Sequence, residues 1–551
     1  MRIPKEHLHL WVQQIADRCN ISVARRVNEA ILWRSYFLDG ARPGNQALFN
    51  KVGVHVDSLA SELYSPNDVR FHFARNRGTD ASIDPILEEC GNVLTDHFDN
   101  DGLAQMVADA MPWALSLGKV FVKLDWQDGR VKPYLVMPYE LGVMREDYNE
   151  LEDQEAICQT FYLSFEELCR MVEGHPREHS IIAAVRGHLG SSTTDDTEGG
   201  YHRIFMGGTQ PIITQGTPQP AGFSSFRPSA PMAELAPETA AEIVKMHELW
   251  VWDDDRKDWT TFQFVSGGIM IEGELQQRNL FLPGLLPFSD LCPNFIPGNF
   301  WGLSEIAPIR KLQDALNERI ADVLYLQELQ IKRPKAMIGF EGMTDERKST
   351  MRKPNGLITE SNFQAKVEDL APPQNPDAVA SIDRLSEMFD KVGGFTATLQ
   401  GEGAAGVRSM GHAETLVRQG SPRMRDRALL IERQVAALGA LTFTLIQNKD
   451  GTQHKAANGA EFLLKSVEDT DFTVTIDAHS SSPVFAQDSL QLAVLLKNEG
   501  VIDGEDFLRL THPPLFTTLL TRLRQREAAQ QKLIAEHPEL LVEGGHGRKK
   551  K

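Results

Sequence analysis

The chain has 551 residues, of which 41% are hydrophobic and 24% charged, and its formal net charge is −19. This composition is typical of a globular protein with roughly two to four domains. Such an acidic chain is not expected to hold nucleic acid over a broad surface, because phosphate binding needs clustered lysine and arginine. The composition does not exclude weak contact with DNA that slides past.

Cysteine usage and apolar runs point to a reduced, non-membrane environment. The five cysteines include no CxxC pair and their number is odd, so we expect buried thiols rather than disulfides. The N-terminus lacks the apolar core of a signal peptide. The most apolar long run, 428–446, contains Glu432 and Arg433, so we do not expect it to cross a bilayer.

The first third of the chain alternates helical and strand patterns. Residues 5–38 are expected to be helical and 69–73 to form a short strand. A helical pattern follows over 83–117, with interruptions expected around Asn100 and Pro112.

A hairpin signal follows. Residues 119–127 alternate in polarity, Asp128-Gly129 is typical of a two-residue turn, and 131–137 continue the alternation. Another strand is expected at 157–162. Ser164 and Glu167 then have the spacing of a capping box at the start of a helix.

Residues 190–237 differ from their surroundings, because Ser, Thr, Gly, Asp and then Pro dominate. This pattern predicts a flexible insertion. Residues 245–252 and 259–265 predict a second hairpin around an acidic turn, and a Pro- and Gly-rich connector leads on to residue 300.

A long helix is the central element of the sequence. In 301–330, Ser304 is a candidate N-cap, while Glu305 and Pro308 suit a first turn. Apolar residues then recur three and four apart on one face, between charged flanks of both signs: Ile306, Ile309, Leu312, Leu316, Ile320, Val323 and Leu324.

The remaining segments are shorter. Residues 331–376 combine short strands with basic turns, 377–392 form a second helix, and 393–411 are rich in Gly and Ala and are expected to be mobile. A helix over 412–447 should be kinked at Gly420 and Pro422, because proline lacks the donor for the helix interior. Two strands are expected within 462–476.

The catalytic and cofactor-binding motifs that we searched for are absent or incomplete. The run Gly401–Gly406 matches GxGxxG but lacks the preceding buried strand and the βαβ unit that a dinucleotide site requires. No P-loop or HExxH motif occurs. The segment DHFDNDG (96–102) resembles a calcium loop, but His97 and Ala108 stand at positions 1 and 12, where acids are required. We therefore expect no enzyme activity, no cofactor and no metal site.

The order of elements resembles the portal protein, or head–tail connector, of tailed bacteriophages. PGNFWGLSEIAPIRKLQDALNE (297–318) is similar to that family's approach to its first stem helix, and ALSLGKVFVKLDWQDG (114–129) with VMPYELGV (136–143) resembles its wing. The resemblance covers most of residues 20–515 and rests on element order and local patterns.

The resemblance implies an α+β, portal-type multidomain subunit with an α/β wing, a two-helix stem, a small β-rich clip, a kinked tunnel helix and a helical crown. It also implies a boundary for each part. The expected parts are the N-terminal arm and wing 1–302, stem helix 1 at 303–330, the clip 331–376, stem helix 2 at 377–392, the tunnel loop 393–411, the kinked tunnel helix with wing strands 412–480, the crown 481–540 and a disordered basic tail 541–551.

The family implies a ring of about twelve subunits at one capsid vertex, in the virion and earlier in the host cytoplasm, through which double-stranded DNA is packaged and ejected. The implied partners are the packaging ATPase (terminase), a head–tail adaptor, and the major capsid and scaffolding proteins, with no membrane. The expected channel residues are Lys391, Gly401, Glu402, Gly403, Gly406 and Arg408. The expected basic docking surface of the clip comprises Lys332, Arg333, Lys335, Arg347, Lys348, Arg352 and Lys353.

Two other classes of protein are alternative interpretations of this sequence. The chain could be another ring-forming virion adaptor, which a channel too narrow for DNA would indicate, or an enzyme, for which clustered acids or a βαβ unit would be needed. The basic turns of the clip could be merely solvated, and the glycine-rich segment could be a surface linker.

Overall fold

The protein is described from a computed structural model. It describes the placement of residues 1–191 and 243–331, except for 67–68, 78–79, 266–267 and 274–276. It also describes 422–476, except for 457–458, 460 and 468–471. The shorter described segments are 335–338, 344–346, 349, 364, 366–369, 377–394, 493–504, 507–508, 519, 522–523 and 525–526. The predictions for 190–237, the tunnel loop, most of the clip and the tail fall largely or wholly outside these residues.

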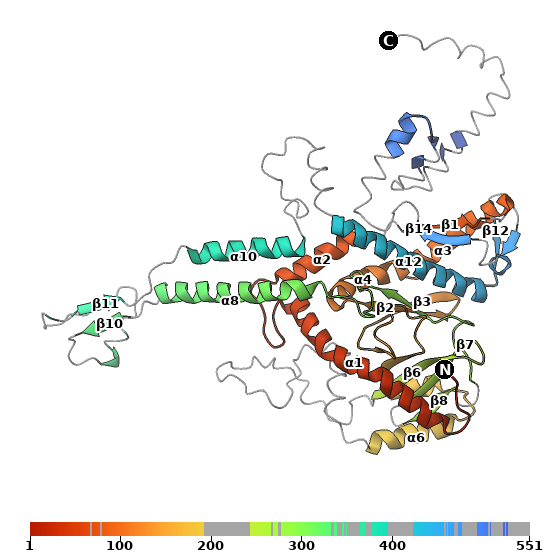
Figure 1. Ribbon diagram of the computed structural model, residues 1–551, viewed down its shortest axis with the longest axis horizontal. Helices are drawn as coiled ribbons and strands as arrows, with labels where there is room; N and C mark the ends of the chain where they lie inside the picture. The colour runs from red at the N-terminus through yellow and green to blue at the C-terminus, as the bar shows by residue number, and fades with distance from the viewer. Residues whose placement is uncertain are drawn as a thin grey trace, which may run out of the picture.

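Four helices from the N-terminal part of the chain belong to the body, and the long helix α1 (Leu8–Asp39) runs along it to the larger sheet (Figure 1). The four are α1, α2 (Lys51–Leu63), α3 (Asp84–Asn100) and α4 (Leu103–Leu117), with the short helix η1 (Ala81–Ile83) before α3. Gly40, with φ 65°, ends α1. The break expected near Asn100 occurs at Asp101 and Gly102, but α4 continues through Pro112, so the expected second interruption was wrong. Burial of α4 outweighs the hydrogen bond that proline loses.

The body also contains two larger antiparallel sheets. One has the order β3-β2-β9, with β2 (Val120–Gln127), β3 (Arg130–Val136) and β9 (Phe288–Leu291). Asp128 and Gly129 both have positive φ, so the predicted two-residue turn between β2 and β3 is confirmed. The other sheet has the order β4-β5-β6-β7-β8 and comprises β4 (Leu141–Val143), β5 (Ala156–Ser164), β6 (Ile243–Asp253), β7 (Asp258–Val265) and β8 (Ile269–Glu272).

Helices α5 (Phe165–Met171) and α6 (Glu178–Ser191) cover one end of the larger sheet. The predicted capping box of Ser164 and Glu167 is present at the start of α5. A separate two-stranded sheet joins distant parts of the chain, because β1 (Phe71–Arg75) pairs with β14 (Phe472–Ile476). β12 (Gln453–Lys455) and β13 (Glu461–Leu463) form a hairpin, and η4 (Leu464–Ser466) follows β13.

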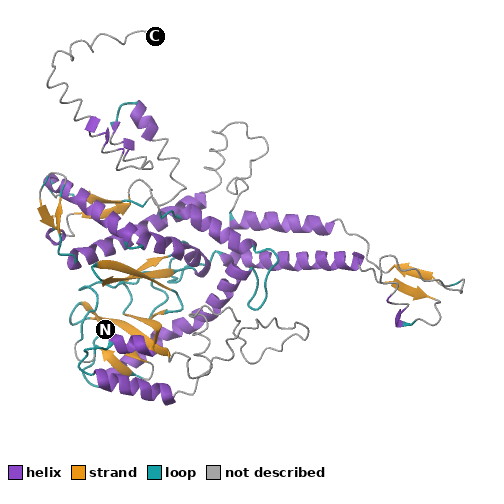
Figure 2. Cartoon of the chain, turned by 180° about the vertical axis from the view of Figure 1, so that it is seen from behind, coloured by secondary structure: helices purple, strands orange, loops and turns teal. Residues whose placement is uncertain are grey.

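Two helices project from the body side by side (Figure 1). α8 (Ile306–Ile331) runs outward and α10 (Asp377–Gly393) returns along it. At about 1.5 Å per residue, α8 is about 40 Å long. At the far end, β10 (Lys335–Ile338) pairs with β11 (Lys366–Asp369), as Figure 2 shows. We call α8 and α10 the stem, and the small sheet the tip.

α12 (Pro422–Lys449) crosses the body and packs against α2, α3 and β14. Pro422 is its first residue, where proline costs little, so the described helix has no interior proline kink. The part of the predicted helix before Pro422 lies outside the described residues.

By length and composition, residues 424–449 of α12 could also cross a membrane, which differs from our sequence expectation. The core helix of a soluble protein passes the same test, and Ile431, Val435 and Leu438 lie in the main hydrophobic core of the body. We interpret α12 as a core helix.

The observed architecture is mixed α+β, with small antiparallel sheets and long helices, as the sequence predicted. The portal-type arrangement and the ring belong to the proposal below.

Candidate functional site

The stem keeps apolar side chains uncovered along its length. On α8 the buried residues are Ile306, Ile309, Gln313 and Leu316, all in the half nearest the body. Farther out, Leu324 is 48% exposed and Tyr325 62%. The long apolar stripe predicted from the sequence therefore has a core partner over only its first part.

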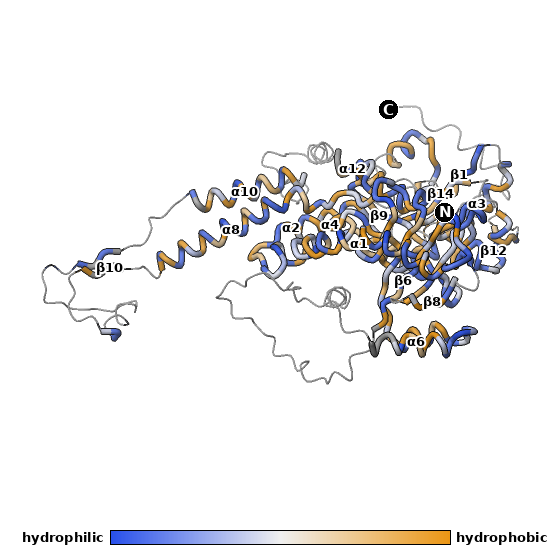
Figure 3. Tube along the Cα trace, turned by 60° about the horizontal axis from the view of Figure 1, so that its bottom comes forward, coloured by the Kyte–Doolittle hydropathy of each residue, from blue (hydrophilic) through white to orange (hydrophobic). Residues whose placement is uncertain are grey.

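The second stem helix behaves in the same way. Val379 is 54% exposed and Met388 53%, although α10 lies along α8. Figure 3 shows hydrophobic residues recurring along both helices well beyond the body. Uncovered apolar side chains that recur along two projecting helices make the stem a candidate interaction surface.

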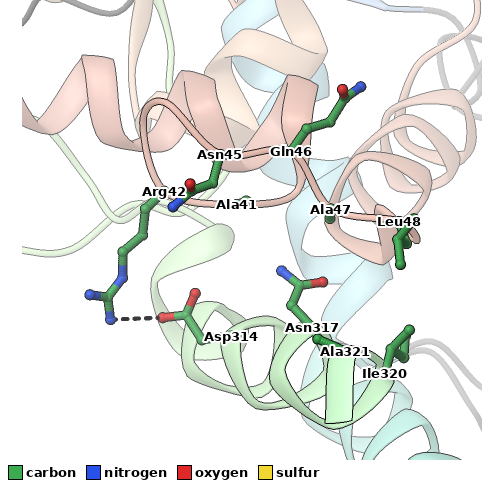
Figure 4. A pocket seen from close by; sticks show the side chains of 10 residues that line it. All are labelled: Ala41, Arg42, Asn45, Gln46, Ala47, Leu48, Asp314, Asn317, Ile320 and Ala321. Carbon is green, nitrogen blue, oxygen red and sulfur yellow. Dashed lines mark hydrogen bonds and ion pairs between the residues drawn. The ribbon is translucent and has the colours of Figure 1, made fainter. Parts of the chain in front are cut away.

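A groove lies where the stem leaves the body, between α8 and the loop that joins α1 to α2 (Figure 4). Its volume is about 360 Å³. Arg42 reaches across it to Asp314, with 3.2 Å between Nη2 and Oδ2, and Leu48 from the loop lies near Ile320 of α8. The hydroxyl of Tyr36 donates to the other carboxylate oxygen of Asp314 at 2.7 Å. Burial and this hydrogen bond raise the pKa of Tyr36.

A buried carboxylate anchors the first stem helix. Glu305, immediately before α8, is only 5% exposed. Its oxygens lie 2.9 Å from Nη2 of Arg427 on α12 and 3.5 Å from Nε2 of His55 on α2, and Asn294 Nδ2 donates to it at 3.0 Å. Burial alone would raise the pKa of Glu305, but the His55 interaction and the Arg427 charge outweigh it and lower that pKa. The carboxylate is therefore ionised at neutral pH.

The second stem helix is anchored by the same body helix, α2. Lys51 Nζ lies 2.8 Å from the carboxylate of Asp390 and donates to the hydroxyl of Ser386 at 2.6 Å. It also lies 5.3 Å from the ring centre of the fully buried Phe389. The His55 ring meets the same phenyl ring edge-on at 6.0 Å. Both stem helices are thus tied to α2 at their body ends.

Only two of the site residues predicted from the sequence are described. Lys391 lies exposed in the last turn of α10, 3.8 Å from Glu387, and its expected contact with DNA stays a prediction. Lys335 begins β10, opposite Asp369. The others lie outside the described residues: Lys332, Arg333, Arg347, Lys348, Arg352 and Lys353 of the clip, and Gly401, Glu402, Gly403, Gly406 and Arg408 of the channel set.

Sequence reasoning missed the anchoring residues. We assigned Glu305 to the helix dipole, whereas its partners come from α2 and α12, which lie far away in sequence. One signal was available, because Lys51 and His55 are four residues apart and therefore share a helix face. Nothing local marks Arg427 as their neighbour.

Within the described part of the chain, no group of three or more His, Cys, Asp or Glu side chains is placed to hold a metal ion. The arrangement at the stem is suited to packing and charge pairing between helices. Comparison with known proteins adds no relatives: no family model matches the chain, and no curated protein sequence is significantly similar to it.

Proposed function

We propose that this chain is the subunit of a portal ring, the head–tail connector of a tailed bacteriophage. The ring would sit at one capsid vertex and form the channel through which double-stranded DNA enters during packaging and leaves during ejection. The subunit has a structural role in this proposal, and the tip would offer the docking surface for the packaging ATPase and the tail adaptor.

The observation that carries the proposal is the projecting stem with uncovered apolar side chains. Leu324 and Tyr325 on α8 and Met388 on α10 stay about half exposed or more within the described part of the subunit. Copies related by rotation about one axis would place stems side by side, and each stem could then cover part of the next. Such head-to-tail contacts close into a ring when the rotation divides a full turn.

Charge and element order support the same proposal. The net charge of −19 would repel phosphate and so let DNA slide through a channel. The order of body, outgoing helix, small sheet, returning helix and crossing helix is the order that the sequence resemblance implies.

Electron microscopy of the purified full-length chain tests the proposal. We expect rings with a central hole wide enough for a DNA duplex. A particle of about 61.6 kDa at micromolar concentration in both low and high salt would overturn it. A ring too narrow for a duplex would instead assign the chain to another ring-forming adaptor.

A matched pair of variants locates the contact. Leu324→Asp places a charge on the exposed stem surface and should abolish rings while leaving the monomer folded, because Leu324 is half exposed. Glu318→Gln changes a charge on the same helix without adding one to an apolar surface, and should leave rings intact. Rings that form normally from Leu324→Asp would exclude this stem surface from the interface.

A further inference from the structure

Four helices meet where the stem joins the body, and we propose that α2 is a clamp that couples both stem helices to the first turns of α12. A displacement of α10 would then be transmitted to α12, and the reverse. This inference concerns the inside of one subunit and goes beyond the proposed function, since it would hold with or without a ring.

The clamp has two contacts on one helix face. Lys51 and His55 are four residues apart on α2 and therefore project side by side. Lys51 holds α10 through Asp390 and Ser386, and His55 reaches Glu305 at the start of α8. One rigid turn of α2 thus contacts the body ends of both stem helices.

Steric contact ties the same turn to the end of α10. A Cβ atom added at Gly393 would lie 2.7 Å from Cε1 of His55, closer than real side chains approach. His55 is only 5% exposed and lies edge-on against the fully buried Phe389. The imidazole has little room to yield, so α10 cannot shift toward α2 without moving His55.

A shared carboxylate carries the contact on to α12. Glu305 lies between His55 of α2 and Arg427 of α12, and its backbone N–H donates to the carbonyl of Leu115 at 2.8 Å, which fixes its position. One carboxylate thus faces both groups. A movement of Arg427 that draws the carboxylate of Glu305 with it separates that carboxylate from His55 as well, and so loosens the packing of His55 against the end of α10.

Hydrogen exchange on the full-length protein tests the coupling from both ends. Arg427→Gln changes only α12, yet amide exchange in residues 385–393 of α10 should accelerate on the order of tenfold. Asp390→Asn changes only α10, yet exchange in residues 424–431 should accelerate as well, because coupling is reciprocal. If each variant accelerates exchange only in its own helix, the proposal is overturned.

Two control substitutions remove the same charges elsewhere on the same helices. Arg433→Gln takes a charge from an exposed position of α12, and Glu387→Gln takes one from an exposed position of α10. Neither should alter exchange in the other helix. A remote effect as large as that of Arg427→Gln or Asp390→Asn would mean that general loosening, rather than the clamp, connects the helices.

A second experiment tests whether the coupling passes through His55. It uses no charge substitution, so it can be done even if a charge variant folds poorly. Gly393→Ala should accelerate exchange in residues 424–431, because the added methyl group displaces His55. In a His55→Ala background the methyl group has room, so Gly393→Ala should have no further effect. An equal effect in both backgrounds would show that α10 and α12 communicate by another route, and would overturn the clamp.

Discussion

The body and the stem differ in which side chains they bury. In the body, even charged groups are enclosed and paired: Lys123 on β2 lies 2.6 Å from Glu248 on β6, and Glu248 is only 5% exposed. In the stem, apolar groups such as Leu324 and Tyr325 remain in contact with solvent. The proposed ring would use the uncovered stem surface, whereas the enclosed groups of the body serve the fold of the subunit. Under that proposal, substitutions in the body should affect folding and substitutions on the stem should affect self-association.

The Lys123–Glu248 pair gives the largest expected effect on folding. Lys123→Met keeps the volume but leaves Glu248 buried without its cation, and should lower the free energy of unfolding by about 3–5 kcal/mol. Trp250 and Gln263 also donate to Glu248, at 2.9 Å and 2.8 Å, but neither carries charge. Chemical denaturation measures the loss, and Lys123→Met/Glu248→Gln should recover much of it. A loss below about 1 kcal/mol would mean that the body tolerates unpaired charge as the stem does.

A matched pair of leucines on α8 tests the comparison within one helix. Leu316 is 1% exposed and Leu324 is 48% exposed. Leu316→Ala should cost about 2–5 kcal/mol, because it opens a cavity in the part of α8 that packs on the body. Leu324→Ala should change the stability of the isolated subunit by less than about 0.5 kcal/mol and weaken self-association instead.

Denaturation of isolated subunits and sedimentation of concentrated protein separate these two effects. The comparison fails if the two leucines cost the same in the monomer. It also fails if Leu316→Ala alone impairs association at a temperature where the variant is fully folded.

Local patterns predicted many of the elements, because each rests on nearby residues, but they missed α2 and α6. The β2–β3 turn, the Ser164 capping box and the stem helices all follow from periodicity, capping or turn chemistry within a few positions. β9 was hidden in a Pro- and Gly-rich stretch, because a four-residue strand is too short to show a period.

Long-range partners could not be predicted from the single sequence. β1 pairs with the distant β14, and Glu305, His55 and Arg427 come from three separate segments. The apolar stripe of α8 predicted a buried face, but periodicity cannot tell burial within a subunit from burial between subunits. Within the subunit, Leu316 is buried and Leu324 is half exposed, a difference that their common stripe does not predict.

The junction between the two regions should show a pH-dependent effect of intermediate size. Glu305→Gln removes the charge that Arg427 and His55 share, at an expected cost of about 1.5–3 kcal/mol near neutral pH. The pKa of Glu305 is lowered in the folded state, so its stabilising contribution is present above the ordinary glutamate pKa and is lost as pH falls through the folded value. The stability curves of wild type and variant should therefore begin to converge as the pH falls below the ordinary glutamate pKa of about 4.3. A constant difference down to about pH 3 would show that the variant loses packing rather than charge pairing.

The smallest expected effect concerns an ion pair on the outer stem. Arg319 and Asp322 are 3.3 Å apart, but their side chains are 58% and 54% exposed, so water and salt screen the pair. Arg319→Gln should change the stability of the isolated subunit by less than about 0.5 kcal/mol, about a tenth of the effect of Lys123→Met. If stems pack side by side, a neighbouring copy would displace water from these charges, and the same substitution should weaken self-association more in low salt than in high salt. Sedimentation of the variant and the wild type at two salt concentrations measures this. Association that is unchanged at both concentrations would place this face of α8 in solvent even in the assembly, and would confine the interface to the apolar flanks.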